Sequence, residues 1–208
     1  MQEVLPDLFV VPANGLKGYG FSHLVKHPKG NILLPRLKAT SLSGSFDDIA
    51  AQGGVRNVLI SDRHFGGPGC REAADHFKAT LYASKIEAEA VHDKCRVDVE
   101  LPFKEQKIDG YIEAIPTPGH QPGQFSYLIT IGKKRCLFTG DFMYRSNKGQ
   151  WIPGNRSRAK MQASFDTVRK LKFDYVVPCA DYDAPDSFVA VKSIDRVVDE
   201  MEASCAAA

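Results

Sequence analysis

Two short loops, each directly after a β-rich segment, constrain this chain more than any other feature. Residues 115–123 read IPTPGHQPG, and residues 136–141 read CLFTGD. The first loop carries His120 and the second carries Asp141, and a hairpin with a tight turn at Gly132 joins them. We therefore expect His120 and Asp141 to lie close together. A neutral imidazole and a carboxylate on neighbouring rigid loops form half of a zinc or iron site.

The pair TPGHQPG and LFTGD resembles the metallo-β-lactamase superfamily, in which the loop histidine and the later aspartate are metal ligands. The resemblance implies the fold of that family, an α+β four-layer αββα sandwich. The predicted order of elements agrees with this fold over nearly the whole chain: a β-meander, then β/α units, then a second β-rich half closed by helices.

The strand and helix predictions follow apolar runs, helical periodicity and turn residues. We predict strands at residues 8–11, 21–26, 31–34, 55–61, 80–82, 111–115, 125–131, 135–138 and 175–177, and helices at 45–52, 71–78, 84–91 and 161–171. Ser84 and Glu87 are read as a capping box that opens the third helix. A last helix is expected to start at Asp186 and to align Val191, Ile194 and Met201 on one face. With 208 residues and 43% hydrophobic content, residues 1–208 fit one domain.

The main metal motif of the superfamily is H-x-H-x-D-H, placed just after a buried strand. Here that place reads SDRHFGG, residues 61–67. In the register that we favour, Asp62 and His64 stand at the first two histidines, and Gly66 and Gly67 replace the aspartate and the third histidine. The alternative register makes His64 the last histidine of the motif, with Ser61 and Arg63 as substitutes.

The last histidine of the family normally follows the late strand, and Ala180 occupies that position. Cys179, Asp181 or Asp183 could substitute after a local shift, but a buried structural role suits Cys179 better. The remaining candidate ligands are His64, His120 and Asp141, with Asp62 as a fourth ligand or as the general base. They suit one divalent ion, zinc or iron, with manganese as a further candidate.

Structural interpretations compete with the ligand roles. His120 could bond to backbone, Asp141 could cap a turn, and Asp62 could form an Asx turn or pair with Arg63. The predicted function is a metal-dependent hydrolase of a small ester, thioester or related substrate. The alternatives are a metal-free pseudoenzyme that acts as a binding module, and a mononuclear iron oxygenase.

Charge and cysteine content narrow the other classes. The net charge of +2 is too small to predict binding to nucleic acid or to a membrane surface, so a small-molecule substrate is the expected partner. The five cysteines form no CxxC pair, which favours a reducing compartment. No leader or membrane span is visible, so we expect a soluble cytoplasmic protein, or a stromal one if a transit peptide has been removed. The sequence does not predict the oligomeric state.

Overall fold

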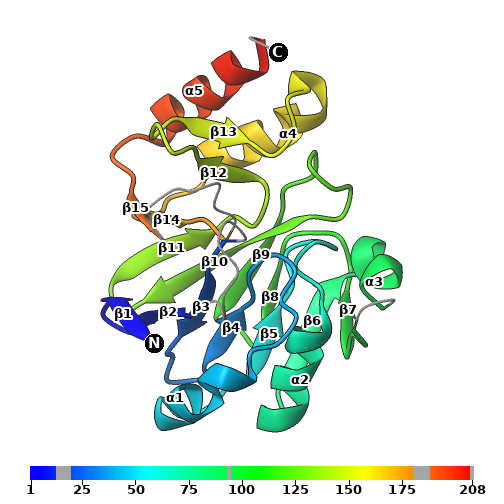
Figure 1. Ribbon diagram of the computed structural model, residues 1–208. Coiled ribbons are helices and arrows are strands. Elements are labelled where there is room, and N and C mark those ends of the chain that lie inside the picture. Colours follow the sequence, from blue (N-terminus) through cyan, green and yellow to red (C-terminus); the bar gives the residue numbers. More distant parts are fainter. Residues whose placement is uncertain (13–19, 93–94, 180–187, 207–208) are drawn as a thin grey trace.

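The computed structural model describes residues 1–12, 20–92, 95–179 and 188–206, and it contains two β-sheets packed against each other (Figure 1). In the first sheet the strands follow sequence order, with an antiparallel meander from β1 to β4 and parallel pairing from β4 to β7. Its strands are β1 (Gln2–Leu5), β2 (Leu8–Val11), β3 (Ser22–Val25), β4 (Ile32–Leu34), β5 (Asn57–Leu59), β6 (Thr80–Ser84) and β7 (Val99–Leu101).

The second sheet has the strand order β15-β14-β11-β10-β9-β8, and a separate hairpin pairs β12 with β13. Neighbouring strands of the second sheet are antiparallel except for β11 and β14, which run parallel. The strands of the second sheet are β8 (Gln106–Ile108), β9 (Ile112–Pro116), β10 (Phe125–Ile131), β11 (Lys134–Phe138), β14 (Tyr175–Val177) and β15 (Val189–Ala190). The strands of the hairpin are β12 (Met143–Arg145) and β13 (Trp151–Pro153).

Helices cover the outer surfaces of both sheets, which completes the predicted αββα sandwich (Figure 1). Helices α1 (Phe46–Ala51), α2 (Pro68–Phe77) and α3 (Lys85–His92) accompany the first sheet, and α1 follows a short 3-10 turn, η1 (Ser43–Ser45). Helices α4 (Arg158–Arg169) and α5 (Ile194–Ala206) accompany the second sheet.

Strand β10 shows why the second sheet is buried on both faces. Tyr127 and Ile129 belong to the core between the two sheets, whereas Leu128 belongs to the core beneath α4 and α5. Successive side chains of a strand point to opposite faces, so a nearly continuous apolar run suits a strand that is covered on both sides. Phe165 of α4 and Met201 of α5 close the second core.

Helices α2 and α4 each begin three residues earlier than predicted, and the residues expected to open α3 and α5 have other roles or lie outside the described residues. Helix α5 begins at Ile194, so Val191 is not part of it. Val191 directly follows β15, and its backbone N–H bonds to the carbonyl of Asp174. Asp186 lies outside the described residues. At α3, Ser84 is the last residue of β6, and its hydroxyl accepts the N–H of Ile86 at 3.2 Å. Glu87 bonds elsewhere, so the capping-box interpretation of this glutamate was wrong.

Candidate metal centre

Asp62 and His64 lie on the loop that follows β5, at an edge where the two sheets meet. The backbone N–H of Phe125, from the second sheet, donates to the carbonyl of Ser61 at 2.9 Å. The N–H of Lys38 donates to the carbonyl of His64 at 3.0 Å. These backbone bonds hold the loop on both sides, and within it the Asp62 side chain accepts the backbone N–H of His64 at 2.8 Å.

His120 lies on the loop between β9 and β10, and three contacts position it. Its Nδ1 bonds to the carbonyl of Gly154 at 2.7 Å. The Asn155 side chain donates to the carbonyl of Gly119 at 3.0 Å, and the Ser164 hydroxyl of α4 donates to the carbonyl of Pro118. An Nδ1–H donated to a carbonyl leaves the Nε2 lone pair free in the neutral ring, which is the usual arrangement of a metal-binding histidine.

Asp141 follows β11 through a glycine that the geometry requires. Gly140 has a φ of +54°, and a Cβ at this position would lie 2.6 Å from the Cβ of Ser61. The left-handed conformation and the close approach both exclude a side chain. The missing side chain lets the Asp141 loop contact the loop that carries Asp62, and Asp141 itself is almost fully buried.

The structure brings all four predicted residues into one cluster, with their potential ligand atoms within 4.8 Å of one another. His64 Nδ1 lies 3.1 Å from Asp141 Oδ2 and 3.1 Å from His120 Nε2. His120 Nε2 lies 3.3 Å from Asp141 Oδ2, and Asp62 Oδ1 lies 3.3 Å from His64 Nδ1. The cluster contains two histidines and two aspartates contributed by both sheets.

These distances fit a metal ion. Bonds of about 2.0–2.2 Å at tetrahedral angles place neighbouring ligand atoms about 3.3–3.6 Å apart, close to the shortest spacings found here. Asp62 Oδ2 and Asp141 Oδ1 are buried and have no hydrogen-bond partner within the described part of the chain. Buried carboxylate oxygens normally have partners, so the two orphaned oxygens fit a site that receives a cation.

The charges of the cluster shift the pKa values of its members in the metal-free protein. Burial alone would lower the pKa of His120, but its bonds to Asp141 and Gly154 and the charges of both aspartates raise it to about 9. Burial and the nearby charge of Asp141 raise the pKa of Asp62 to about 7, although the His64 N–H donates to Asp62 Oδ1. Burial alone would raise the pKa of Asp141, but the hydrogen bonds and charges of His120 and His64 lower it.

Gly66 and Gly67, which stand at ligand positions of the family motif in the favoured register, are closely packed. A Cβ on Gly66 would lie 2.9 Å from a methyl group of Val91, and a Cβ on Gly67 would lie 2.5 Å from the carbonyl oxygen of Ala39. The structure therefore leaves no space for ligand side chains at these two positions without rearrangement.

In the alternative register the substitutes would be Ser61 and Arg63, and the Arg63 side chain pairs with Glu87. Cys179 is buried outside the cluster, and burial raises the pKa of its thiol to about 12. Ala180, Asp181 and Asp183 lie outside the described residues.

The sequence interpretation missed the role of Glu87. Its carboxylate is fully buried and bonds to Arg63, on the Asp62 loop, and to Gly123, on the His120 loop. Helical spacing carried a signal, because Glu87 precedes the buried Val91 by four residues and therefore shares its face.

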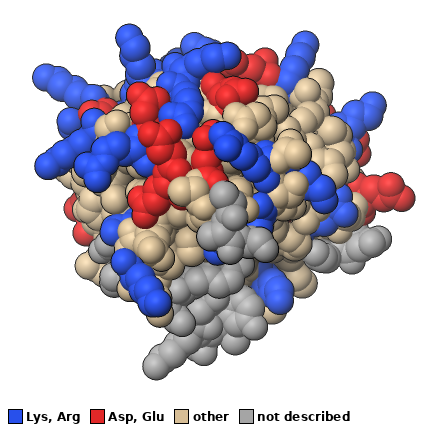
Figure 2. Space-filling view, turned by 90° about the horizontal axis from the view of Figure 1, so that it is seen from above, with Lys and Arg blue, Asp and Glu red and all other residues tan. Residues whose placement is uncertain are grey.

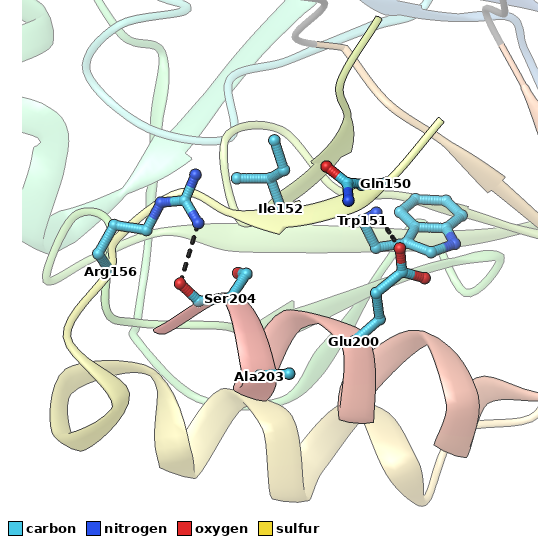
Figure 3. Close-up of a pocket in the computed structure, with 7 residues that line it drawn as sticks. All are labelled: Gln150, Trp151, Ile152, Arg156, Glu200, Ala203 and Ser204. Atoms are coloured by element: carbon cyan, nitrogen blue, oxygen red, sulfur yellow. Dashed lines mark hydrogen bonds between the residues drawn. The ribbon is translucent and has the colours of Figure 1, made fainter. Parts of the chain in front are cut away.

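A separate cavity of about 590 Å³ lies between β13 and α5 (Figure 3). In this cavity the Arg156 guanidinium donates to the Ser204 carbonyl at 3.1 Å, and the backbone N–H of Trp151 donates to Glu200 Oε1 at 3.2 Å. Its lining residues are Gln150, Trp151, Ile152, Arg156, Glu200, Ala203 and Ser204, and none belongs to the metal cluster.

The surface above α4 and α5 carries both signs of charge. Figure 2 shows acidic side chains among the basic ones on this side of the molecule. Arg169 lies 3.2 Å from Asp195 and 2.6 Å from Asp199, and Arg158 lies 2.8 Å from Glu202. The basic side chains of α4 are thus partly neutralised by α5. Among the described residues, no helix is long and apolar enough to cross a membrane.

An αββα sandwich with histidines and aspartates gathered at one edge of its two sheets defines a protein of the metallo-β-lactamase fold class. The sequence model of the metallo-beta-lactamase superfamily matches residues 49–180, more than half of the chain. The chain therefore belongs to the metallo-beta-lactamase superfamily. Members of this superfamily bind divalent metals, typically zinc. No curated protein matches the chain.

Solved structures share the fold at low sequence identity. A metallo-beta-lactamase from Cronobacter sakazakii with a HARLDQ motif is 20% identical, with a TM-score of 0.65 over 86% of this chain and 80% of that chain. A beta-lactamase from Chitinophaga pinensis is 17% identical, with a TM-score of 0.66 over 95% and 89%. A B3 metallo-beta-lactamase with an active-site glutamic acid is 18% identical, with a TM-score of 0.66 over 99% and 88%.

Proposed function

We propose that this chain is a metal-dependent hydrolase that binds one divalent ion and acts on a small ester, thioester or related substrate. Superfamily membership and the four-residue cluster support the hydrolase class. The observation that carries the proposal is the spacing of 3.1–3.3 Å among His64 Nδ1, His120 Nε2 and Asp141 Oδ2. Two imidazoles with one or two carboxylates suit zinc or iron, with manganese as a further candidate.

Each side chain has a distinct role in this proposal. His64, His120 and Asp141 hold the ion, and Asp62 is either a fourth ligand or the general base. A bound divalent ion would lower the pKa of water towards neutrality and so supply hydroxide for attack on a carbonyl carbon. As a general base, Asp62 would accept a proton at Oδ2, which has no partner among the described residues.

The packing of Gly66 and Gly67 supports one ion rather than two. In the favoured register both glycines stand at ligand positions of the family motif, and Val91 and Ala39 occupy the adjacent space. A second ion would therefore lack these two ligands. The proposal is accordingly limited to a single-metal site.

Elemental analysis of protein purified without added metal or chelator tests this proposal. We expect about one zinc, iron or manganese per chain in the wild type, and loss of the ion in His120→Ala and in Asp141→Ala. His76→Ala is the matched control, because His76 is an exposed histidine of α2 outside the cluster, and this variant should keep the ion.

The outcome also separates the rival functions. Zinc together with ester or thioester turnover would support the hydrolase, whereas iron together with O₂ uptake would support a mononuclear iron oxygenase. A wild-type protein without metal, even after reconstitution, would contradict the proposal and favour a metal-free binding module.

A further inference from the structure

Glu87 is a buried carboxylate that connects the two loops of the candidate metal centre from behind. Its side chain is 0% exposed, on a helix that contributes no ligand to the cluster. Oε2 accepts the Arg63 Nε–H at 2.5 Å, and Oε1 accepts the backbone N–H of Gly123 at 2.9 Å. Each oxygen of one carboxylate therefore bonds to a different loop.

The first contact lies within the ligand segment itself. Asp62 and His64 contribute ligand atoms to the cluster, whereas the residue between them, Arg63, bonds to Glu87 on α3. The Arg63 backbone N–H also approaches Glu87 Oε2, at 3.4 Å. Glu87 thus restrains both the backbone and the side chain of the residue that separates two candidate ligands.

The second contact lies three residues after His120. A Cβ on Gly123 would lie 2.6 Å from the Cβ of Ile86 and 2.9 Å from the Cγ of Glu87. The backbone of the His120 loop therefore packs directly on the start of α3. Only a residue without a side chain allows the Gly123 N–H to reach the carboxylate without moving the helix.

Packing alone does not explain a charged residue at this position. A buried carboxylate is costly unless charges and donors compensate it, and an apolar side chain would fill the same volume. Hydrogen bonds to an ionised group are shorter and stronger than neutral ones, and they are directional. A carboxylate can therefore fix the separation of two loops more narrowly than an apolar contact can.

We propose that Glu87 is a positioning residue that orders the Asp62–His64 loop against the His120 loop before any metal binds. This inference rests on the proposed function, because it assigns Glu87 the task of keeping the ligands of that site close to their binding geometry. Groups that orient metal ligands typically contribute about 10-fold to 100-fold in metal affinity.

The experiment compares Glu87→Gln with Glu89→Gln, an isosteric change at an exposed glutamate of the same helix. Arg63→Gln removes the ion pair with Glu87 from the loop side. The Arg63 side chain is 35% exposed, so this variant serves if Glu87→Gln does not fold.

Two quantities are measured in each protein. One is the dissociation constant for Co²⁺, from its visible absorption; the other is the nuclear Overhauser effect between the rings of His64 and His120 in the metal-free protein.

The ring centroids of His64 and His120 are 5.0 Å apart, so the metal-free wild type should show the Overhauser effect. We expect Glu87→Gln and Arg63→Gln each to weaken this effect and to raise the Co²⁺ dissociation constant about 10-fold or more, with the double variant no worse than the more severe single one. The saturated Co²⁺ spectrum should keep its shape, because the ligands are unchanged. Glu89→Gln should match the wild type.

A purely structural role would give a different result. If Glu87→Gln lowers the melting temperature but leaves the Overhauser effect and the Co²⁺ affinity unchanged, the inference is wrong. A wild type that takes up no Co²⁺ would instead contradict the proposed function. The Overhauser comparison in metal-free protein would then still decide whether Glu87 orders the two loops.

Discussion

His120 shows how the surroundings of one side chain set its chemistry. Its Nδ1 bonds to the Gly154 carbonyl, and its Nε2 faces His64 and Asp141. Without a metal ion, the protonated ring donates to the Gly154 carbonyl and to the Asp141 carboxylate, and the pKa of His120 rises to about 9 despite burial. A metal ion and a proton therefore compete for the same nitrogen atom.

This competition predicts how the stability of the metal-free protein depends on pH. The pKa of His120 is higher in the folded state, about 9, than in the unfolded state, 6.5, so its contribution is complete below pH 6.5. Stability should fall by about 1–3 kcal/mol as the pH rises from 6.5 to 9. The raised pKa of Asp62, about 7, should likewise lower the stability of the metal-free protein as the pH rises from 3.8 to 7.

Urea denaturation at pH 6, 7.5 and 9 in the presence of a chelator measures this effect. His120→Gln is the control, and its stability should change less between pH 6.5 and 9 because the titrating ring is absent. A wild-type stability that is constant or increases over this interval would contradict the assignment.

The start of α2 is closely packed where the favoured register places ligands of the family motif. The helix begins at Pro68, a residue suited to the first helical turn, and the Gly67 N-cap is extended. The Gly69 N–H donates to the Ala39 carbonyl at 3.1 Å, which draws this segment against the chain after β4. Gly67 is close to the same carbonyl, so the segment has no room for the histidine that the favoured register of the family motif would place there.

We expect Gly67→Ala to destabilise the protein by about 2–4 kcal/mol, because the new Cβ would lie 2.5 Å from a backbone oxygen. Gly110→Ala is the comparison: its φ of +75° strains a side chain, but no atom lies within 4 Å of the new Cβ. That variant should lose about 1 kcal/mol. Equal losses in chemical denaturation would show that steric exclusion does not keep Gly67 free of a side chain.

Across the molecule, the metal centre depends on how the two sheets are placed relative to each other. Asp62 and His64 follow a strand of the first sheet, whereas His120 and Asp141 follow strands of the second. Tyr127 links the sheets in the core, where its hydroxyl donates to the Ile60 carbonyl at 2.8 Å. Ile60 precedes Asp62 by two residues, so this bond lies directly beneath the ligand loop.

Tyr127→Phe should therefore lower stability by about 1–2 kcal/mol, because it leaves the buried Ile60 carbonyl without this donor. For a chain of this size, the melting temperature should fall by about 2–8 °C. Tyr175→Phe is the control, since the described residues offer its half-buried hydroxyl no hydrogen bond, and it should change stability by less than about 0.5 kcal/mol. Equal effects in differential scanning calorimetry would contradict the role of the bond between the sheets.

Local patterns, together with the family resemblance carried by two short motifs, were sufficient to predict the sandwich and the loops of His120 and Asp141. Strand alternation, apolar runs and glycine turns depend on residues close in the sequence, so strands such as β10 and β11 agree closely with their predicted ranges. His120 and Asp141 are separated by one hairpin, and hairpin geometry brings such residues together.

Contacts between distant segments could not be predicted in this way. The proximity of Asp62 and His64 to His120, the lack of space at Gly67 and the two bonds of Glu87 each depend on the packing of the sheets and helices. Neighbouring residues restrict local backbone conformation, but they carry no measure of the distance between segments far apart in the chain. Glu87 therefore resembled a helix cap in the sequence, and the folded chain made it a link between the two metal loops.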